Sequence, residues 1–196
     1  TLAVWGGAVR ATAKRGTLFI DSSTTDVGSA RAAHEIAAKA HMLSLDAPVS
    51  GGVGGAEAGT LTFMCGGAAA AFDMAKPVLE AMGKRIVHCG DAGAGQAAKI
   101  CNNMILGISM IGVCEASTSS GQCWSLSSYC PVPGPVPAAP SNRDYKPGFS
   151  SALMLKDLKL AQEAASAAGA VTPLGAMAAQ LYALSNAWAQ AGVDLS

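Results

Sequence analysis

Lys99 and Asn103 are the residues whose types and spacing point most directly to chemistry. They lie in the segment 93–103, GAGQAAKICNN, where a glycine-broken turn leads into an apolar helix. Residues four apart share one helical face, so the ammonium and the amide would project side by side. An apolar setting lowers the pKa of a lysine, which suits it to proton transfer at neutral pH. The alternative is a solvated lysine at a helix start, and the spacing alone leaves both readings open.

A second candidate site follows an apolar run in the segment 46–52, DAPVSGG, which enters a glycine-rich loop at 51–55. Backbone N–H groups freed by glycines can form an anion-binding nest, and the Ser50 hydroxyl adds a donor. We expect a small carboxylate as the guest of this loop. An ordinary flexible turn is the alternative.

The other charged and titratable candidates are weaker. Lys156 and Asp157 are adjacent in an apolar helix, where such a pair is usually exposed but can also reach a cofactor. His34 and His41 fall in an alanine-rich helix, and His88 ends a predicted strand. We interpret the three histidines as structural or surface residues.

Apolar runs, and the glycine, proline and polar residues that end them, predict the strands and helices that position these residues. Short apolar runs closed by polar or glycine residues predict strands at 17–21, 43–49, 61–65 and 85–89. Helical periodicity predicts helices at 27–42, 70–82, 96–116, 149–168 and 173–191. The segment 117–148 is rich in Ser, Pro and Gly and is expected to be irregular. The alternation predicts an α/β first part, residues 1–91, and an all-α second part, residues 92–196.

Composition restricts the class of protein. Of 196 residues, 51% are hydrophobic and 13% charged, which indicates a buried core. The net charge is zero without a basic stripe, which argues against nucleic acid and acidic membranes as partners. No apolar run reaches the length of about twenty residues that spans a bilayer. Met is absent from the start, and the chain opens at 1–5 as if within a helix, so we expect a fragment.

The cysteines argue against a metal site. None of the six forms a Cys-x-x-Cys pair or has a histidine at ligand spacing. We expect reduced, mostly buried thiols, because free cysteines behave as small apolar residues. The six are Cys65, Cys89, Cys101, Cys114, Cys123 and Cys130.

Taken together, these segments resemble the β-hydroxyacid dehydrogenase family. The resemblance runs in order through residues 21–24 (DSST), 46–52, 93–103 and 153–158 (LMLKDL), with further similarity at 123–124 and 142–149. It implies a remnant of a Rossmann-type NAD-binding domain followed by a helical domain like that of 6-phosphogluconate dehydrogenases. The dinucleotide fingerprint is absent, and about twenty helical residues after Ala116 are missing relative to the family pattern. We therefore expect little or no activity from this chain alone.

The resemblance also implies roles for individual residues. Lys99 would act as the general acid/base on the substrate hydroxyl, and Asn103 would hold that oxygen. The implied substrate-carboxylate site is Ser50, Gly51 and Gly52, and the implied cofactor contacts are Ser23 and Lys156. Asn102 stands where the related 6-phosphogluconate enzymes carry histidine, which argues against a sugar phosphate substrate.

The activity implied by the resemblance is NAD-dependent oxidation of 3-hydroxyisobutyrate to methylmalonate semialdehyde, in valine breakdown. An NADPH-dependent glyoxylate or succinic semialdehyde reductase and a non-catalytic fragment are the alternatives. NADP remains open as the cofactor. The resemblance further implies a small hydroxy acid as partner and homo-oligomers built through the C-terminal helices. It implies a mitochondrial location in eukaryotes and a cytoplasmic one in bacteria.

Overall fold

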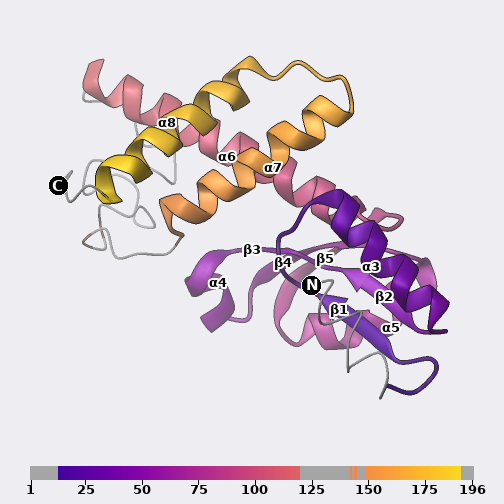
Figure 1. Cartoon of the computed structure of the whole chain (residues 1–196). Helices are drawn as coiled ribbons and strands as arrows, with labels where there is room; N and C mark the ends of the chain where they lie inside the picture. Colours follow the sequence, from indigo (N-terminus) through magenta and orange to yellow (C-terminus); the bar gives the residue numbers. More distant parts are fainter. Residues whose placement is uncertain (1–12, 120–141, 143, 145–148, 191–196) are drawn as a thin grey trace. The chain divides into compact units, whose positions relative to one another are not determined.

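The computed structural model describes residues 13–119, 142, 144 and 149–190. Its elements are β1 (Leu18–Asp21), α3 (Val27–Lys39), β2 (Leu43–Asp46), β3 (Val49–Ser50), α4 (Gly52–Glu57), β4 (Leu61–Gly66), α5 (Ala69–Glu80), β5 (Gly83–Gly90), α6 (Ala94–Ser119), α7 (Ser151–Ala167) and α8 (Pro173–Gln190). An α/β part is followed by a helical part, which confirms the predicted fold class (Figure 1).

The described residues divide into two compact units. The first holds the residues up to Asn102 together with Ser166–Ala168, and the second holds the remainder from Asn103 onward. The boundary falls within α6, so this helix begins in one unit and continues into the other. In the described part of the chain, no helix is both long and apolar enough to cross a membrane.

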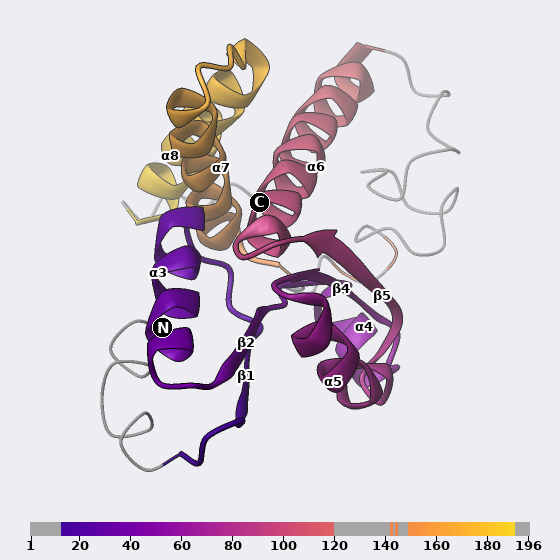
Figure 2. The same ribbon diagram turned by 90° about the vertical axis from the view of Figure 1, so that its right-hand side faces the viewer.

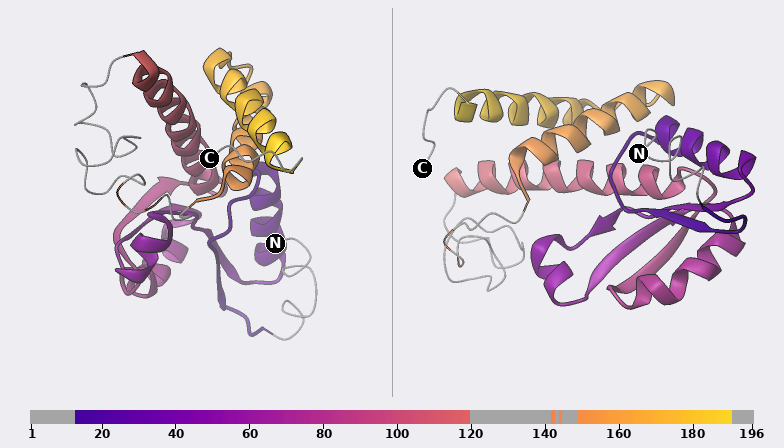
Figure 3. Two further views of the ribbon diagram at one scale, coloured as in Figure 1. Left: turned by 90° about the vertical axis from the view of Figure 1, so that its left-hand side faces the viewer. Right: turned by 60° about the horizontal axis from the view of Figure 1, so that its bottom comes forward.

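The first unit is built on a mixed sheet. Its described strands follow the order β1-β2-β4-β3, with β5 beside β4. β1 and β2 are parallel, with Asp21 opposite Asp46, so both strands end at the same edge. β3 is antiparallel to β4, whereas β5 is parallel to it. Helices α3 and α5 cover opposite faces of this sheet (Figures 2 and 3).

Apolar burial holds the first unit together. Leu45, Phe63 and Leu79 are completely or almost completely buried in one cluster, where the small side chains of α5 let the helix approach the sheet. Burying one such large side chain contributes about 1.5–3 kcal/mol. Asp26 is the N-cap of α3, and its carboxylate accepts a hydrogen bond from the Ser29 amide at 2.6 Å. Hydrogen bonds from Ser29 lower the pKa of Asp26, as expected for a helix N-cap.

The second unit consists of helices. α7 and α8 run in opposite directions on either side of a turn at Gly169, which adopts a φ of 65° (Figure 1). Met154 and Leu158 of α7 are buried against α8 and the second half of α6. The predicted helices 149–168 and 173–191 are confirmed to within two residues at each end.

Two predicted segments differ from the structure. The predicted strand 43–49 is broken into β2 and β3 at Ala47-Pro48, because proline has no N–H for a continuous ladder. The predicted loop 51–55 is wrong: a short helix, α4, occupies Gly52–Glu57. Gly51 supplies the entry with a φ of 138°, and its carbonyl then accepts the Gly55 N–H at 3.0 Å. Glycine provided the turn but did not prevent the helix that follows.

The predicted helix 27–42 ends earlier, at Lys39, and is followed by His41 with a φ of 56°. The expected irregular segment 117–148 begins later than predicted, since α6 extends to Ser119. Its remainder lies outside the described residues except for Asn142 and Asp144, and so do the expectations for 1–5 and 123–124.

Candidate active site

Lys99 and Asn103 are both buried on α6. Lys99 is 7% exposed and Asn103 is 1% exposed. A lysine is almost never this deeply buried without partners or a function, because an ammonium loses much of its hydration free energy. The alternative of a solvated lysine at a helix start is therefore wrong.

Asp46, at the end of β2, fixes the start of the helix that carries Lys99. Its Oδ1 accepts the Gly93 N–H at 2.9 Å, and its Oδ2 accepts the Gln96 N–H at 2.9 Å. The first N–H groups of a helix have no intrahelical partner, and a carboxylate stabilises them by hydrogen bonding and by charge. Asp46 is 3% exposed, so this N-terminal cap is shielded from water.

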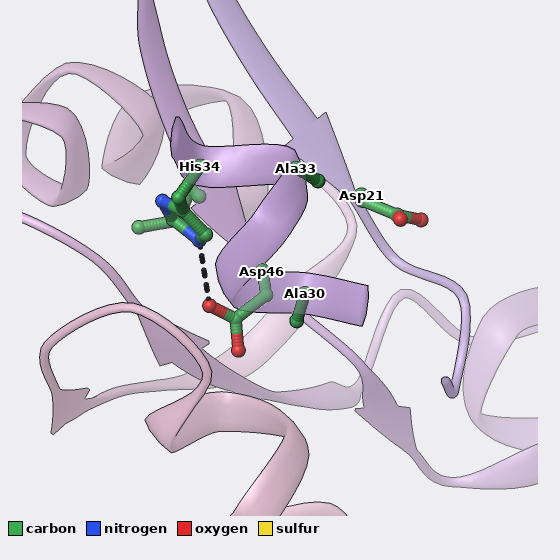
Figure 4. Close-up of a pocket in the computed structure, with 6 residues that line it drawn as sticks. Asp21, Ala30, Ala33, His34 and Asp46 are labelled. Carbon is green, nitrogen blue, oxygen red and sulfur yellow. Dashed lines mark hydrogen bonds and ion pairs between the residues drawn. The ribbon is translucent and has the colours of Figure 1, made fainter. Parts of the chain in front are cut away.

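His34 and Ser44 orient the Asp46 carboxylate. His34 Nε2 lies 2.8 Å from Asp46 Oδ1, and its Nδ1 lies 2.6 Å from the Ser44 hydroxyl. Figure 4 shows the His34 ring of α3 pointing at Asp46, beside a small pocket that Asp21 also lines. Because a carboxylate only accepts, Nε2 donates to Asp46, and a neutral ring then accepts the Ser44 O–H at Nδ1.

These residue types are also those of a Ser-His-Asp catalytic triad. Here the carboxylate is committed to the backbone of α6, and Ser44 is 8% exposed. The arrangement therefore supports a helix start and does not present a nucleophile to a substrate.

Two glycines allow this helix start to approach the sheet closely. A Cβ on Gly66 would lie 2.6 Å from the Gly95 nitrogen and 2.7 Å from the Asp46 carboxylate. A Cβ on Gly95 would overlap the Met64 carbonyl and lie 2.7 Å from the Asp46 carbonyl. Both positions exclude any side chain, so the spacing between β4 and α6 depends on glycine.

Gln96 ties the loop after β1 to α6. Its side chain is completely buried, donates to the Ser23 carbonyl at 2.8 Å and accepts the Thr25 N–H at 3.1 Å. Asp21 Oδ1 accepts the Ser23 N–H at 3.0 Å. Ser23 is thereby held through its backbone while the residue itself remains exposed.

In the second unit, Asp157 links Asn103 to Lys156. Asp157 Oδ2 accepts a hydrogen bond from Asn103 Nδ2 at 2.5 Å, and Lys156 Nζ lies 3.2 Å from Oδ1. Asp157 is 2% exposed, whereas the Lys156 side chain is 44% exposed. The pair is therefore exposed only at its lysine, and its carboxylate orients the Asn103 amide.

Ser50, Gly51 and Gly52 form the junction of β3 and α4. Gly51 and Gly52 both have positive φ, of 138° and 60°, and both are exposed. Ser50 pairs with Thr62 of β4. The junction thus presents exposed backbone, and its role toward a carboxylate stays a prediction.

The cysteines and histidines in the described part of the chain show no arrangement for catalysis. Cys65, Cys89 and Cys101 are free thiols, but Cys101 is exposed, so its predicted burial was wrong. Burial raises the pKa of Cys65 to about 12, and burial also raises the pKa of Cys89. His88 Nε2 lies 2.8 Å from the Gly67 carbonyl and its ring stacks on Phe72, which agrees with a structural role.

Comparison with known proteins agrees with the resemblance seen in the sequence. Residues 2–90 match the NAD binding domain of 6-phosphogluconate dehydrogenase, and residues 116–196 match the model described as NAD-binding of NADP-dependent 3-hydroxyisobutyrate dehydrogenase. A solved structure of Mycobacterium tuberculosis 3-hydroxyisobutyrate dehydrogenase with L-serine has a TM-score of 0.82 at 51% identity, covering 91% of this chain and 67% of that one. The chain belongs to the 3-hydroxyisobutyrate dehydrogenase family.

Curated relatives from this family have similar identities. A probable 3-hydroxyisobutyrate dehydrogenase of Mycobacterium tuberculosis is 52% identical over 193 residues, which is 89% of this chain and 66% of the relative. The mitochondrial 3-hydroxyisobutyrate dehydrogenase of Drosophila melanogaster is 49% identical over 184 residues, 85% of this chain and 57% of the relative. The chain spans between 57% and 67% of the length of these relatives.

The family assignment confirms that the chain belongs among the oxidoreductases and that its cofactor class is NAD or NADP. The two matching regions leave 91–115 between them, and this interval holds the first part of α6 with the buried Lys99 and Asn103. Asp46 and Gln96 were not recognised as site residues from the sequence. Their contacts join positions 47 to 73 residues apart, which no local pattern marks.

Proposed function

We propose that the protein catalyses NAD-dependent oxidation of 3-hydroxyisobutyrate to methylmalonate semialdehyde. The observation that carries the proposal is the buried Lys99, with the buried Asn103 one helical turn later, in a chain of this family. An amine in a water-poor setting suits proton transfer at neutral pH. We assign residues 1–91 to the dinucleotide part and residues 92–196 to the helical part.

In this mechanism Lys99, as the neutral amine, takes the proton of the substrate hydroxyl. Asn103 holds the hydroxyl oxygen, and Asp157 fixes the orientation of the Asn103 amide. NAD, when bound, supplies the acceptor for the hydride that leaves the hydroxyl-bearing carbon. The hydrogen with its electron pair would thus go to NAD and the O–H proton to Lys99, which leaves a double bond between the carbon and the oxygen. In the reverse reaction Lys99 returns the proton.

The residues present fit a dinucleotide. In open α/β sheets, ligands bind beyond the carboxyl ends of the strands, and the loop after β1 lies at such an edge. Ser23 is exposed there on a fixed backbone, and Lys156 offers a half-exposed ammonium that suits a polar or charged part of the cofactor. For the substrate carboxylate we propose the partly buried Ser50 together with the exposed backbone of Gly51 and Gly52.

The experiment compares the full-length enzyme with its Lys99→Ala variant, because little or no activity is expected from this chain alone. We expect NADH formation from 3-hydroxyisobutyrate to fall by about 10²–10⁴-fold in the variant, because general acid/base catalysis is lost. NADH binding, measured by fluorescence, should stay within about twofold. Near-normal turnover without Lys99 would overturn the proposed role. Glyoxylate and succinic semialdehyde with NADPH, assayed in parallel, test the reductase alternative.

L-serine is a second candidate substrate. A solved relative at 51% identity carries L-serine, which is also a 3-hydroxy acid with a carboxylate. The same Lys99 chemistry applies to its hydroxyl. Comparison of kcat/KM for 3-hydroxyisobutyrate and L-serine decides between them, and a higher value for L-serine would overturn the first assignment.

The cellular setting follows from the family alone. We propose a homo-oligomer that takes part in valine breakdown. Its location would be mitochondrial in a eukaryote, as the name of the Drosophila relative states for that protein, and cytoplasmic in a bacterium.

A further inference from the structure

Among the described residues of the first unit, Gln96 has the most completely buried polar side chain, with 0% exposure. A buried primary amide needs partners for both its donor and its acceptor, since an unpaired polar group is costly to bury. Gln96 finds both on one short loop. Its Nε2 donates to the Ser23 carbonyl at 2.8 Å, and its Oε1 accepts the Thr25 N–H at 3.1 Å.

The Gln96 amide contacts the loop in the way that a residue of a neighbouring β-strand would. In a parallel sheet, one residue donates its N–H to the C=O of residue i and accepts the N–H of residue i+2 with its own C=O. Here the two residues of the loop are Ser23 and Thr25. The Gln96 amide presents the same two groups from a side chain. It therefore fixes the backbone on both sides of Thr24. A carboxylate or an apolar side chain of the same size cannot make both bonds.

Further hydrogen bonds fix both ends of the loop. Asp21 Oδ1 accepts the Ser23 N–H, and the next residue after Thr25 is Asp26, the N-cap of α3. With its backbone fixed, the loop leaves Ser23 exposed at the edge where β1 and β2 end. A fixed backbone with an exposed polar residue at this edge is what a nucleotide site requires.

We propose that Gln96 is a positioning residue that holds the loop 22–25 in the shape that receives the dinucleotide. The inference rests on the proposed function, because it takes Ser23 as a cofactor contact. Gln96 lies one helical turn before Lys99, so the first turns of α6 carry both the clamp on the cofactor loop and the acid/base group. The affinity for the cofactor then depends on Gln96, although its side chain is hydrogen-bonded to the loop and does not contact the cofactor.

The test uses two variants of the same size and a matched control, all made in the full-length enzyme. Gln96→Glu places an oxygen against the Ser23 carbonyl, and Gln96→Met removes both bonds without adding charge. Gln180→Glu makes the same chemical change at an exposed position of α8. Circular dichroism verifies folding, and Gln96→Met carries the test if Gln96→Glu unfolds. NADH fluorescence titration gives the affinity, and hydrogen exchange gives the protection of the Thr25 amide.

We expect both Gln96 variants to bind NADH at least about tenfold more weakly, with faster exchange at Thr25. The KM for the 3-hydroxy acid should change by less than about twofold, which separates loop positioning from general loss of structure. Gln180→Glu should match the unmodified protein in all three measurements.

Two results would overturn the inference: unchanged exchange at Thr25, or faster exchange with unchanged NADH affinity. Failure of the unmodified protein to bind NADH would overturn the proposed function as well. If the unmodified protein binds NADH but does not turn over 3-hydroxyisobutyrate, the proposed substrate is wrong. The role of Gln96 is then still decided by the NADH affinity and the Thr25 exchange of the two variants.

Discussion

Asp157 illustrates how a single buried carboxylate can set the orientation of a neighbouring group. Its Oδ2 accepts from the Asn103 amide, while its Oδ1 faces the half-exposed Lys156. An amide side chain can turn over and exchange its donor and acceptor ends, but a carboxylate partner stabilises only the orientation with Nδ2 toward it. Asn103 therefore enters the proposed chemistry with a fixed orientation.

Removal of this carboxylate should be costly. In Asp157→Ala the Asn103 amide loses its acceptor in a buried place, so we expect the free energy of unfolding to fall by about 1–3 kcal/mol. Asp157→Asn keeps an oxygen acceptor and should lose less. Urea denaturation measures both, with the exposed Asp73→Ala as a control expected to lie within about 0.5 kcal/mol of the unmodified protein. Equal stability of Asp157→Ala and Asp73→Ala would contradict this account.

At the scale of elements, the start of α6 is fixed by contacts to three parts of the first unit. Asp46 of β2 caps it, Gly66 of β4 lets it approach, and its own Gln96 holds the loop after β1. His34 of α3 in turn orients Asp46. The position of Lys99 relative to the sheet is thus determined before the helix makes its second turn.

Two glycine substitutions should separate this close approach from ordinary helix propensity. Gly95→Ala places a methyl group against the Met64 and Asp46 carbonyls, so we expect a loss of about 1–3 kcal/mol of unfolding free energy. Gly54→Ala in α4 meets nothing within 4 Å and should gain about 0.4–1 kcal/mol. Thermal denaturation compares the two, and a stabilised Gly95→Ala variant would show that the spacing of β4 and α6 is not fixed.

The elements themselves were largely predictable, because hydrophobic runs and breakers act locally. The runs at 17–21 and 61–65 became β1 and β4, and the long apolar pattern became α6. The failures were also local: α4 formed in a glycine-rich segment, and Pro48 broke a strand. The roles of Asp46 and Gln96 were not predictable, since they depend on pairings that only the folded chain creates.

At the scale of the whole molecule, ligand binding can be measured as a change in stability, because a ligand that binds only the folded state shifts the unfolding equilibrium. A ligand that binds only the folded state at one hundred times its Kd adds about 2.7 kcal/mol to the free energy of unfolding. For a chain of 196 residues this corresponds to a rise in Tm of about 5–10 °C.

This linkage distinguishes the two cofactors. If NAD is the natural cofactor, NADH should raise the Tm of the purified protein more than NADPH does at equal concentration. Differential scanning fluorimetry across a concentration series measures both shifts. A larger shift with NADPH would assign the protein to NADP, and no shift with either would contradict dinucleotide binding.

The continuity of α6 has a consequence for how this chain can change over generations. Gln96, Lys99 and Asn103 are spaced by three and four residues, and each residue of an α-helix advances by about 100° around the axis. Inserting or deleting one residue between Gln96 and Asn103 would turn the later group away from the face set by the earlier one. Substitutions can accumulate along this stretch, whereas a change in its length would separate the anchored start of the helix from the Asp157 contact.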